Sequence, residues 1–391
     1  MTHLQADVVV IGVGAMGSAT LWHLAERGVR AVGFERFEPG HDRGSSHGQS
    51  RIFRTAYLEG ASYVPLALRA VELWQELQRV SDADLMIPTG VLMLGPRDSA
   101  VVTGTMNSIR VHDLPHQMLG EDEIRARYPA HRVEPGDVGI FEERAGLLYP
   151  ERAIRAAARR AETLGATIVR GATVDRIETG PWGVRVAAGE VRCEARHAVV
   201  SVGSWLPRFL PALRLPLRVT RQVITWFPVD RPEAFDPDRF PVFARDIGGD
   251  EAAGATTSDS SFYGFPTLDG RTVKLAIHRE GRTADPDDLD RSVTSEDLAP
   301  VQAYIRRFLE GVGTDAVRAQ VCMYTNTPDH DFLIGSPPDL PNVTILGGFS
   351  GHGFKFASVV GEIGADLATE GRTRHDIGWL SPTRFLQGAM S

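Results

Sequence analysis

The sequence predicts an α/β protein in which a parallel, helix-flanked sheet is interleaved along the chain with an antiparallel sheet. Three observations lead to this prediction. A strand, a glycine-rich turn, a helix and a second strand follow one another over residues 7–35, an order typical of a parallel sheet with a right-handed crossover. A second α/β pattern occupies residues 150–205, and strand-like segments that suit a separate lobe occupy residues 87–95 and 217–278.

The first strand is a β-branched run over Asp7–Ile11, and helical spacing of apolar residues follows over Ser18–Arg27. The turn between them, Gly12-Val-Gly14-Ala-Met-Gly17, matches the pattern G-x-G-x-x-G. In that pattern Gly12 permits the tight turn, Gly14 lets the backbone approach a pyrophosphate, and Gly17 allows close packing of helix on strand. The N-terminus of the helix attracts the anion, so the turn predicts a dinucleotide site.

The second strand, Val29–Glu35, ends in an acidic residue 23 residues after Gly12. A carboxylate at a spacing of about 20 residues accepts hydrogen bonds from the hydroxyl groups of a bound ribose. The unit alone does not separate FAD from NAD. Its place near the N-terminus and the return of the α/β pattern over 150–205 favour FAD, because a flavin needs a long cleft and a second lobe over its ring.

Further helices are predicted over Tyr63–Val80 and Pro150–Leu164, and a strand over Thr167–Val169 opens a β-patterned region that continues through Val200. Small and polar residues dominate Gly248–Ser261, which predicts a mobile loop. We therefore divide the chain into a discontinuous FAD-binding domain (1–85, 148–215 and 320–391) and a substrate domain (86–147 and 216–319).

The composition limits the class of partner. There are 42 Lys+Arg and 50 Asp+Glu, a formal net charge of -8, which argues against general attraction to nucleic acid or anionic membranes. No segment is long and apolar enough to cross a bilayer. The two cysteines, Cys193 and Cys322, are far apart and form no disulfide or metal-binding pattern. We expect a cytoplasmic protein without a metal, whose anionic ligands are held by specific cations.

Two segments supply such cations. The loop GSSHGQSRIFR contains Ser45 and His47, and its arginines Arg51 and Arg54 are three residues apart. On a helical turn both guanidinium groups would face one side and could hold a carboxylate, although a solvated basic turn is the alternative. The second segment is Gly347-Gly-Phe-Ser-Gly-His-Gly-Phe-Lys-Phe356, whose cation is its lysine. It joins a strand to a helix and directs main-chain N–H groups toward the space above the junction.

A third cation lies in a strand-like run, Val273–His278. Strand alternation places Lys274, Ala276 and His278 on one face. A lysine on the inner face of a sheet is costly unless it has a partner or a task. The alternative, with both charged residues on a wet face of the sheet, stays open on the pattern alone.

Taken together, these motifs resemble those of the monomeric sarcosine oxidase and N-methyltryptophan oxidase group, within the wider D-amino acid oxidase-like flavoproteins. The resemblance runs in order along nearly the whole chain. It is carried by GVGAMG, GSSHGQSRIFR, YLEG, YVPLALRA, YGFP, the K-x-x-x-H pair, VCMYTNTPDHDFLIG and GGFSGHGFKFASVVGEI. It implies an FAD-binding Rossmann-type domain interleaved with an antiparallel-sheet substrate domain, and it implies a monomer.

The resemblance also implies an activity. Such a protein is an FAD-dependent oxidase of a secondary amino acid, which removes the methyl group of sarcosine or a related N-methyl amino acid. The products are formaldehyde, the primary amino acid and hydrogen peroxide, formed from O2. The small-molecule amino acid and O2 would be the only partners, with no nucleic acid and no membrane.

Roles follow residue by residue from this resemblance. Cys322 matches the cysteine that tethers FAD through its 8α-methyl group, and Arg54 and Lys355 match the pair that grips the substrate carboxylate. Lys274 matches a lysine that helps oxygen react near flavin N5. Further matches are neighbours of the substrate (Tyr263, His278), residues flanking the flavin, where positive charge would favour its reduced form (His47, Arg51), and segments near the ring (Thr325, Phe349, Gly351).

The resulting site prediction has three parts. The catalytic residues are Lys274, His278, Arg51, His47 and Tyr263. The substrate-binding residues are Arg54, Lys355, Tyr263 and Gly351. The cofactor-binding residues are Gly12, Gly14, Gly17, Glu35, Ser45, Arg51, Cys322, Thr325, Phe349 and Lys355.

One departure concerns the substrate. Ala244 stands where sarcosine oxidases resemble one another in carrying methionine over the pocket, and the smaller side chain should enlarge that pocket. N-methyltryptophan, another N-methyl amino acid, pipecolate or a glycated amino acid are therefore alternatives. A flavin dehydrogenase that passes electrons to a carrier is an alternative of another class, against which Lys274 argues. A nicotinamide enzyme or a non-catalytic Rossmann module would leave the motifs after residue 320 unexplained.

Overall fold

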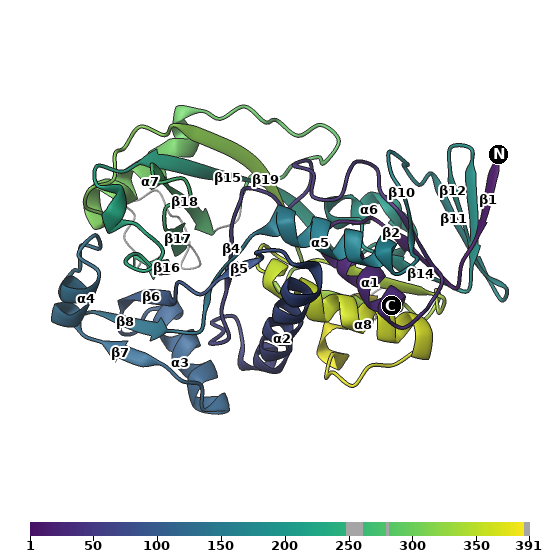
Figure 1. The fold of residues 1–391 in the computed structure, drawn as a ribbon, viewed down its shortest axis with the longest axis horizontal. Coiled ribbons are helices and arrows are strands. Elements are labelled where there is room, and N and C mark those ends of the chain that lie inside the picture. The colour runs from purple at the N-terminus through teal and green to yellow at the C-terminus, as the bar shows by residue number, and fades with distance from the viewer. Residues whose placement is uncertain (248–260, 279–280, 387–391) are drawn as a thin grey trace.

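The computed structural model describes residues 1–247, 261–278 and 281–386. Two large sheets lie toward opposite ends of the long axis of the molecule (Figure 1). The mobile loop predicted over 248–261 lies outside the described residues except for Ser261. No helix in the described ranges is long and apolar enough to cross a membrane.

A six-stranded sheet contains the N-terminal β-α-β unit. Its neighbouring strands are parallel except for one antiparallel pair at the edge formed by β20 and β21. Buried valines and isoleucines dominate its central strands, as expected for a sheet covered on both faces. In spatial order the strands are β10 (Thr167–Val169), β3 (Ala31–Phe34), β2 (Val8–Ile11), β14 (His197–Val200), β21 (Val343–Gly347) and β20 (Leu333–Gly335).

Opposite faces of this sheet bury different partners. Val8 and Val10 belong to the same core cluster as the helices α1 (Ala15–Glu26), α5 (Pro150–Thr163) and α8 (Ala357–Glu370). Val9 and Ile11 pack with a second cluster, which includes a four-stranded sheet of β1 (Thr2–Gln5), β13 (Val191–Ala195), β12 (Gly183–Ala188) and β11 (Arg176–Gly180). Successive side chains of β2 therefore point alternately into one core and into the other.

The eight-stranded sheet forms the other lobe. Its order is β19 (Arg318–Asn326), β15 (Arg218–Pro228), β18 (Thr272–His278), β17 (Ser261–Phe265), β16 (Val242–Asp246), β6 (Val91–Pro96), β8 (Asp137–Glu142) and β7 (Gln117–Leu119). Its neighbouring strands are antiparallel except for the parallel pair β16 and β6. Helix α7 (Ser295–Phe308) packs on one face in an aromatic core, and the other face looks toward the first lobe.

The remaining elements connect these layers. Three short strands, β4 (Arg51–Phe53), β9 (Gly146–Leu148) and β5 (Met86–Ile87), form a small sheet between the lobes. The other helices are α2 (Val64–Ser81), α3 (Ala100–His112), α4 (Glu121–Arg127), α6 (Leu206–Phe209) and α9 (Thr383–Leu386).

The predicted α/β class with interleaved sheets is confirmed, with local differences. Helix α1 begins at Ala15 rather than at Ser18, because the glycine turn is only three residues long before the helix starts. Strand β19 pairs along its length with β15 of the large sheet, although the domain boundary predicted at 320 assigns most of it to the FAD-binding domain. The rest of that division stays a prediction.

Candidate active site

A cavity of about 830 Å³ is lined by residues from both lobes. Gly12, Gly14 and Glu35 line one part of it, from the ends of β2 and β3 and the start of α1. Cys322 and Lys355 line another part. The cavity therefore joins the carboxyl ends of the parallel strands, where α/β sheets bind ligands, to the inner face of the large sheet.

In the glycine turn, Gly12 and Gly17 are required by close contacts within the protein, whereas Gly14 leaves open space. Gly12 has φ of +88°, and a Cβ there would lie 2.6 Å from the main-chain oxygen of Ser201. A Cβ on Gly17 would lie 1.8 Å from the oxygen of Gly12, whereas one on Gly14 would meet no atom within 4 Å. The backbone at Gly14 is thus open to a pyrophosphate, which fits a dinucleotide.

Glu35 is 4% exposed and lines the cavity at the end of β3. Its Oε2 accepts a hydrogen bond from the N–H of Val13 at 2.8 Å, and its Oε1 accepts one from the N–H of Phe37 at 2.8 Å. Each carboxylate oxygen has a second lone pair. The fixed carboxylate can therefore also accept hydrogen bonds from the hydroxyl groups of a ribose, and this end of the cavity fits a dinucleotide such as FAD.

One face of the large sheet forms another wall of the cavity. Cys322 and Tyr324 are two residues apart on β19, and Cys322 is opposite Gln222 on β15. Further across the same sheet, Ala244 on β16 is opposite Tyr263 on β17. Because successive side chains point to opposite faces, these residues share one face. The cavity-lining residues of this face are Gln222, Ile224, Ala244, Asp246, Ser261, Tyr263, His278, Cys322 and Tyr324.

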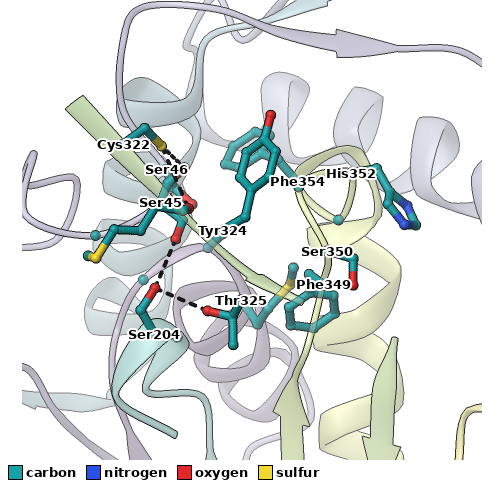
Figure 2. Close-up of a pocket in the computed structure, with 18 of the residues that line it drawn as sticks. Ser45, Ser46, Ser204, Cys322, Tyr324, Thr325, Phe349, Ser350, His352 and Phe354 are labelled. Atoms are coloured by element: carbon teal, nitrogen blue, oxygen red, sulfur yellow. Dashed lines mark hydrogen bonds between the residues drawn. The ribbon is translucent and has the colours of Figure 1, made fainter. Parts of the chain in front are cut away.

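Arg51 lies beside the only cysteine that lines this cavity, Cys322. Its Nη1 donates to the oxygen of Ser50 at 2.8 Å, and its Nη2 donates to the oxygen of Ser45 at 2.9 Å and lies 3.9 Å from Cys322 Sγ. The thiol donates to the same Ser45 oxygen at 3.4 Å. A thiol and a fixed cation therefore meet at one point of the cavity wall. Figure 2 shows the thiol of Cys322 beside Ser45.

A row of hydroxyl groups continues from there. Thr325 Oγ1 donates to Ser204 Oγ at 3.1 Å, and the hydroxyl groups of Ser204 and Ser45 lie 3.5 Å apart. Figure 2 shows this row on the side of the cavity that also carries Phe349, while Tyr324 stands between the row and His352. Thr325 and Phe349 line the cavity, as does Gly351. A Cβ on Gly351 would lie 2.4 Å from the ring of Tyr324, so glycine makes room for that ring.

Arg54 and Lys355 flank one aromatic ring. The guanidinium of Arg54 lies 4.7 Å from the ring centroid of Tyr57, and the ammonium of Lys355 lies 4.8 Å from it. Arg54 donates to Glu59 Oε2 at 2.8 Å and to the oxygen of Ala56 at 2.7 Å. Both cations are buried and line the cavity, so together they form a site for an anionic group.

The helical turn expected to align Arg51 with Arg54 is wrong, because Arg51 begins strand β4 and Arg54 follows its end. A spacing of three residues on an extended chain directs the side chains to opposite sides. Arg51 accordingly contacts Cys322, and Arg54 contacts Glu59. Both still line the cavity, at different positions.

Burial and neighbouring charges shift the pKa values of Lys355 and of Glu59. Burial, together with the nearby Arg54, lowers the pKa of Lys355 to about 7, against the opposing effect of Glu59. Burial would raise the pKa of Glu59, but Arg54, His352 and Lys355 outweigh it and lower that pKa to about 2. The cluster therefore keeps Glu59 ionised and leaves Lys355 ready to gain a proton when an anion arrives.

His278 and Tyr263 lie beside the anion site on the large sheet. His278 Nδ1 lies 3.3 Å from the hydroxyl of Tyr324. Burial lowers the pKa of His278 and raises the pKa of Tyr263. Both side chains are therefore neutral at pH 7, the histidine with a ring nitrogen available as a proton acceptor.

Lys274 lies outside the main cavity. It is 3% exposed, which excludes the wet-face alternative, and its Nζ donates to the oxygen of Gly48 at 2.9 Å and to that of Ser50 at 2.7 Å. The ammonium also lies 4.3 Å from the ring centroid of Phe265. Burial and the nearby Arg51 lower its pKa well below the ordinary value.

His47 does not line the cavity either, and it is 2% exposed. Neither ring nitrogen has a hydrogen-bond partner among the described residues. Burial, together with the cation of Arg51, lowers the pKa of His47 to about 4. His47 is therefore neutral at pH 7 in this structure, and Arg51 carries the charge of this pair. The role of His47 beside the flavin stays a prediction.

The structure adds residues that the site prediction missed. Glu59 and Tyr57 complete the anion site, and Tyr324 and Ser204 line the wall near Thr325. Glu59 and Tyr324 belong to the motifs YLEG and VCMYTN, and the two-residue spacing of Tyr324 from Cys322 is a signal for the shared face. The sequence gives no comparable signal for Ser204.

Comparison with known proteins decides the family. A family model described as FAD dependent oxidoreductase matches residues 7–367. The chain belongs to this family. It is 40% identical over 383 residues to monomeric sarcosine oxidase of Streptomyces avermitilis, covering 97% of both chains. It is 33% identical over 386 residues to N-methyl-L-tryptophan oxidase of Salmonella arizonae, covering 98% of this chain and 100% of the relative.

A solved structure gives the same assignment. The open form of NikD, an unusual amino acid oxidase essential for nikkomycin biosynthesis, aligns with a TM-score of 0.84 at 25% identity. The alignment covers 97% of this chain and 98% of NikD. This FAD-dependent oxidoreductase therefore has the fold of a known amino acid oxidase.

Proposed function

We propose that this FAD-dependent oxidoreductase oxidises the C–N bond of a secondary amino acid and thereby removes the methyl group of sarcosine or a related N-methyl amino acid. The observation that carries the proposal is the anion site, in which Arg54 and Lys355 lie 4.7 and 4.8 Å from the ring of Tyr57. The relatives named for sarcosine and N-methyl-L-tryptophan support it.

The anion site would bind the carboxylate of the substrate. Arg54 offers a planar donor and Lys355 a point charge, and carboxylates form charge-assisted hydrogen bonds with both. Glu59 already accepts from Arg54, so the incoming carboxylate competes with Glu59 for that guanidinium. The ring of Tyr57 excludes water from beneath both cations, which strengthens the attraction.

With its carboxylate held, the substrate amine would lie toward the wall that carries His278 and Tyr263. A neutral imidazole accepts a proton from the amine, and oxidation requires the amine to be unprotonated. Bound FAD supplies the acceptor for the two electrons and the proton that leave the N-methyl carbon, and it passes the electrons to O2. In sum, the N-methyl amino acid, O2 and water give formaldehyde, the primary amino acid and hydrogen peroxide.

Other residues would hold the cofactor. Gly12, Gly14 and Glu35 suit the pyrophosphate and the ribose, and Cys322 suits the covalent link to the flavin ring because its thiol lines the cavity beside Arg51. The cation of Arg51 would stabilise negative charge on the reduced ring. Ser45, Thr325 and Phe349 line the same stretch of the cavity and would contact the cofactor.

Lys274 would assist the reaction with oxygen, since its buried side chain, when protonated, stabilises the charge that develops on O2. This role separates an oxidase from a flavin dehydrogenase that uses an electron carrier. With Lys274→Met we expect the rate of flavin reoxidation by O2 to fall much more than the rate of flavin reduction by substrate. Equal effects on both rates would remove Lys274 from this role.

Substrate size depends on Ala244, which lines the cavity opposite Tyr263. A methyl group at this position leaves room for a side chain on the α-carbon of the substrate. We therefore propose that an N-methyl amino acid larger than sarcosine, such as N-methyl-L-tryptophan, is also oxidised. Pipecolate and glycated amino acids share the carboxylate and the secondary amine and belong in the same substrate panel.

The first test is the absorbance spectrum of the purified protein before and after acid precipitation, followed by anaerobic addition of sarcosine and of N-methyl-L-tryptophan. We expect a flavin spectrum that bleaches with at least one compound. A flavin that no member of the panel reduces would overturn the proposed substrate class, and a colourless protein would overturn the proposal altogether. We also propose a monomer, as the name of the sarcosine oxidase relatives suggests, which light scattering checks.

A further inference from the structure

A second, much smaller cavity lies beside Lys274. Its volume is about 10 Å³, close to the space that one water molecule needs. Phe265 lines both this cavity and the main one, so its ring forms a partition between them. An amino acid cannot enter so small a space, whereas a molecule of two or three atoms can.

The small cavity is lined both by solvent-exposed residues and by the buried Lys274. Its outer residues include Gln49, Asp269 and Leu268, all solvent-exposed, with Leu268 36% exposed. Its inner residues include Lys274 at 3% and Ser50 at 1% exposure. We call this cavity, from Leu268 to Lys274, the lysine inlet.

The outer rim of the lysine inlet has a defined shape. Asp269 Oδ1 accepts the N–H of Arg271 at 2.9 Å and that of Thr272 at 2.8 Å, which fixes the turn that carries Leu268. On the other side, Trp226 Nε1 donates to Gln49 Oε1 at 3.1 Å. Leu268 is therefore a side chain on a fixed turn at the rim, where its size can control what passes.

The inner end of the lysine inlet can receive a small guest. Ser50 Oγ is buried, and no atom of the described residues forms a hydrogen bond with it. The ammonium of Lys274 donates two of its three N–H bonds to main-chain oxygens, and it faces the ring of Phe265 at 4.3 Å. A buried hydroxyl without a partner beside a partly used ammonium leaves polar groups that a small guest could contact.

We propose that dioxygen reaches Lys274 through the lysine inlet, by a route separate from that of the amino acid substrate. The inference rests on the proposed function, in which Lys274 promotes the reaction with O2. Dioxygen is small and neutral, so it crosses a narrow passage without the cost of removing hydration from a charge. A separate passage lets oxygen arrive while the oxidised product still fills the main cavity.

The test varies the size of the side chain at the rim and measures each half-reaction of the flavin enzyme by stopped-flow absorbance. The variants are Leu268→Ala, Leu268→Phe and Leu268→Trp. The flavin is first reduced with dithionite or by light, so that reoxidation is measured without any amino acid substrate. We expect the second-order rate constant for O2 to fall with side-chain size, by fivefold or more for Leu268→Trp, while reduction by substrate changes less than twofold.

Val111→Trp is the matched control, because Val111 is 60% exposed and lies on α3, outside the residues that line the inlet. It should change neither rate. Melting temperature and flavin content check that each variant is folded and loaded. Reoxidation rates that are equal across the three Leu268 variants would overturn the proposal. A failure of the proposed substrate class is distinct, since it leaves reoxidation of chemically reduced flavin measurable.

Discussion

The pKa of Lys355 gives a prediction for the pH dependence of carboxylate binding. Burial lowers that pKa to about 7 in the free protein, so the ammonium form is lost as pH rises through 7. A bound carboxylate favours the ammonium form and raises the pKa again. We therefore expect simple carboxylates to bind more weakly with rising pH, with proton uptake on binding.

The size of the effect follows from linkage. If the ammonium form binds, the affinity falls about tenfold for each pH unit above the pKa. The affinity stops falling once Lys355 is neutral and Arg54 alone binds the carboxylate. A hydrogen bond to a charged group contributes about 1.5–3 kcal/mol, which corresponds to a total loss of about 10-fold to 150-fold. The slope should therefore begin near pH 7 and level off one to two units higher.

Neighbouring groups do not titrate in this range. The pKa of Glu59 is lowered to about 2 and that of His352 to about 3. Burial lowers the pKa of His278 from 6.5 and raises that of Tyr57 well above 10. Of these groups around the anion site, Lys355 is the one whose charge changes between pH 7 and pH 9.

The assay is a titration of the oxidised holoenzyme with propionate from pH 6 to pH 9, followed through the flavin spectrum. Propionate has no amine, so titration of the ligand does not contribute. Lys355→Arg is the control, because its guanidinium stays charged and should give a flat profile. A flat profile for the unmodified protein, or an unchanged slope in Lys355→Arg, would refute the assignment of the proton to Lys355.

Three further predictions concern the wall of the large sheet. Acid precipitation should carry the flavin down with the unmodified protein but release it to the supernatant from Cys322→Ser, and flavin that stays with the variant would exclude Cys322 as the link. Ala244→Met should lower kcat/KM for N-methyl-L-tryptophan about 10-fold to 200-fold relative to that for sarcosine, and an unchanged ratio would show that this position does not limit substrate size. Asp137→Ala leaves the guanidinium of Arg245 buried without its carboxylate, so urea unfolding should show a loss of about 3–5 kcal/mol, whereas a loss below 1 kcal/mol would contradict this account of the pair.

Much of the fold follows from local patterns. The strand, glycine turn and helix over residues 8–26 agree with the predicted unit, because Gly12 and Gly17 each meet a local steric demand. The parallel pairing of β16 with β6 has no such signal, since it joins residues 242–245 to 91–94 across the chain. Pairing between distant segments depends on the arrangement of the whole sheet, which a single strand's pattern does not contain.

The features of the site likewise fall into those that the sequence predicts and those that it does not. The presence of Tyr263 and Cys322 at the cavity was predictable from the family resemblance, and both line it. The charge of His47 was not, because its pKa depends on burial and on Arg51, which only the folded chain supplies. The direction of the Arg54 side chain was not predictable either. A spacing of three residues places Arg51 and Arg54 on the same side of a helix but on opposite sides of a strand.

Strand β16 shows how one segment combines specificity with stability. Ala244 faces the cavity, whereas its neighbour Arg245 is 1% exposed and forms an ion pair with Asp137 on β8. The guanidinium also donates to the oxygen of Arg132 at 3.1 Å and lies 4.0 Å from the ring centroid of Phe308. Because alternation separates the two faces, position 244 can change to suit another substrate while the ion pair keeps the strand in register. The side chain at 244 is thus free to set substrate size, and its neighbour is not.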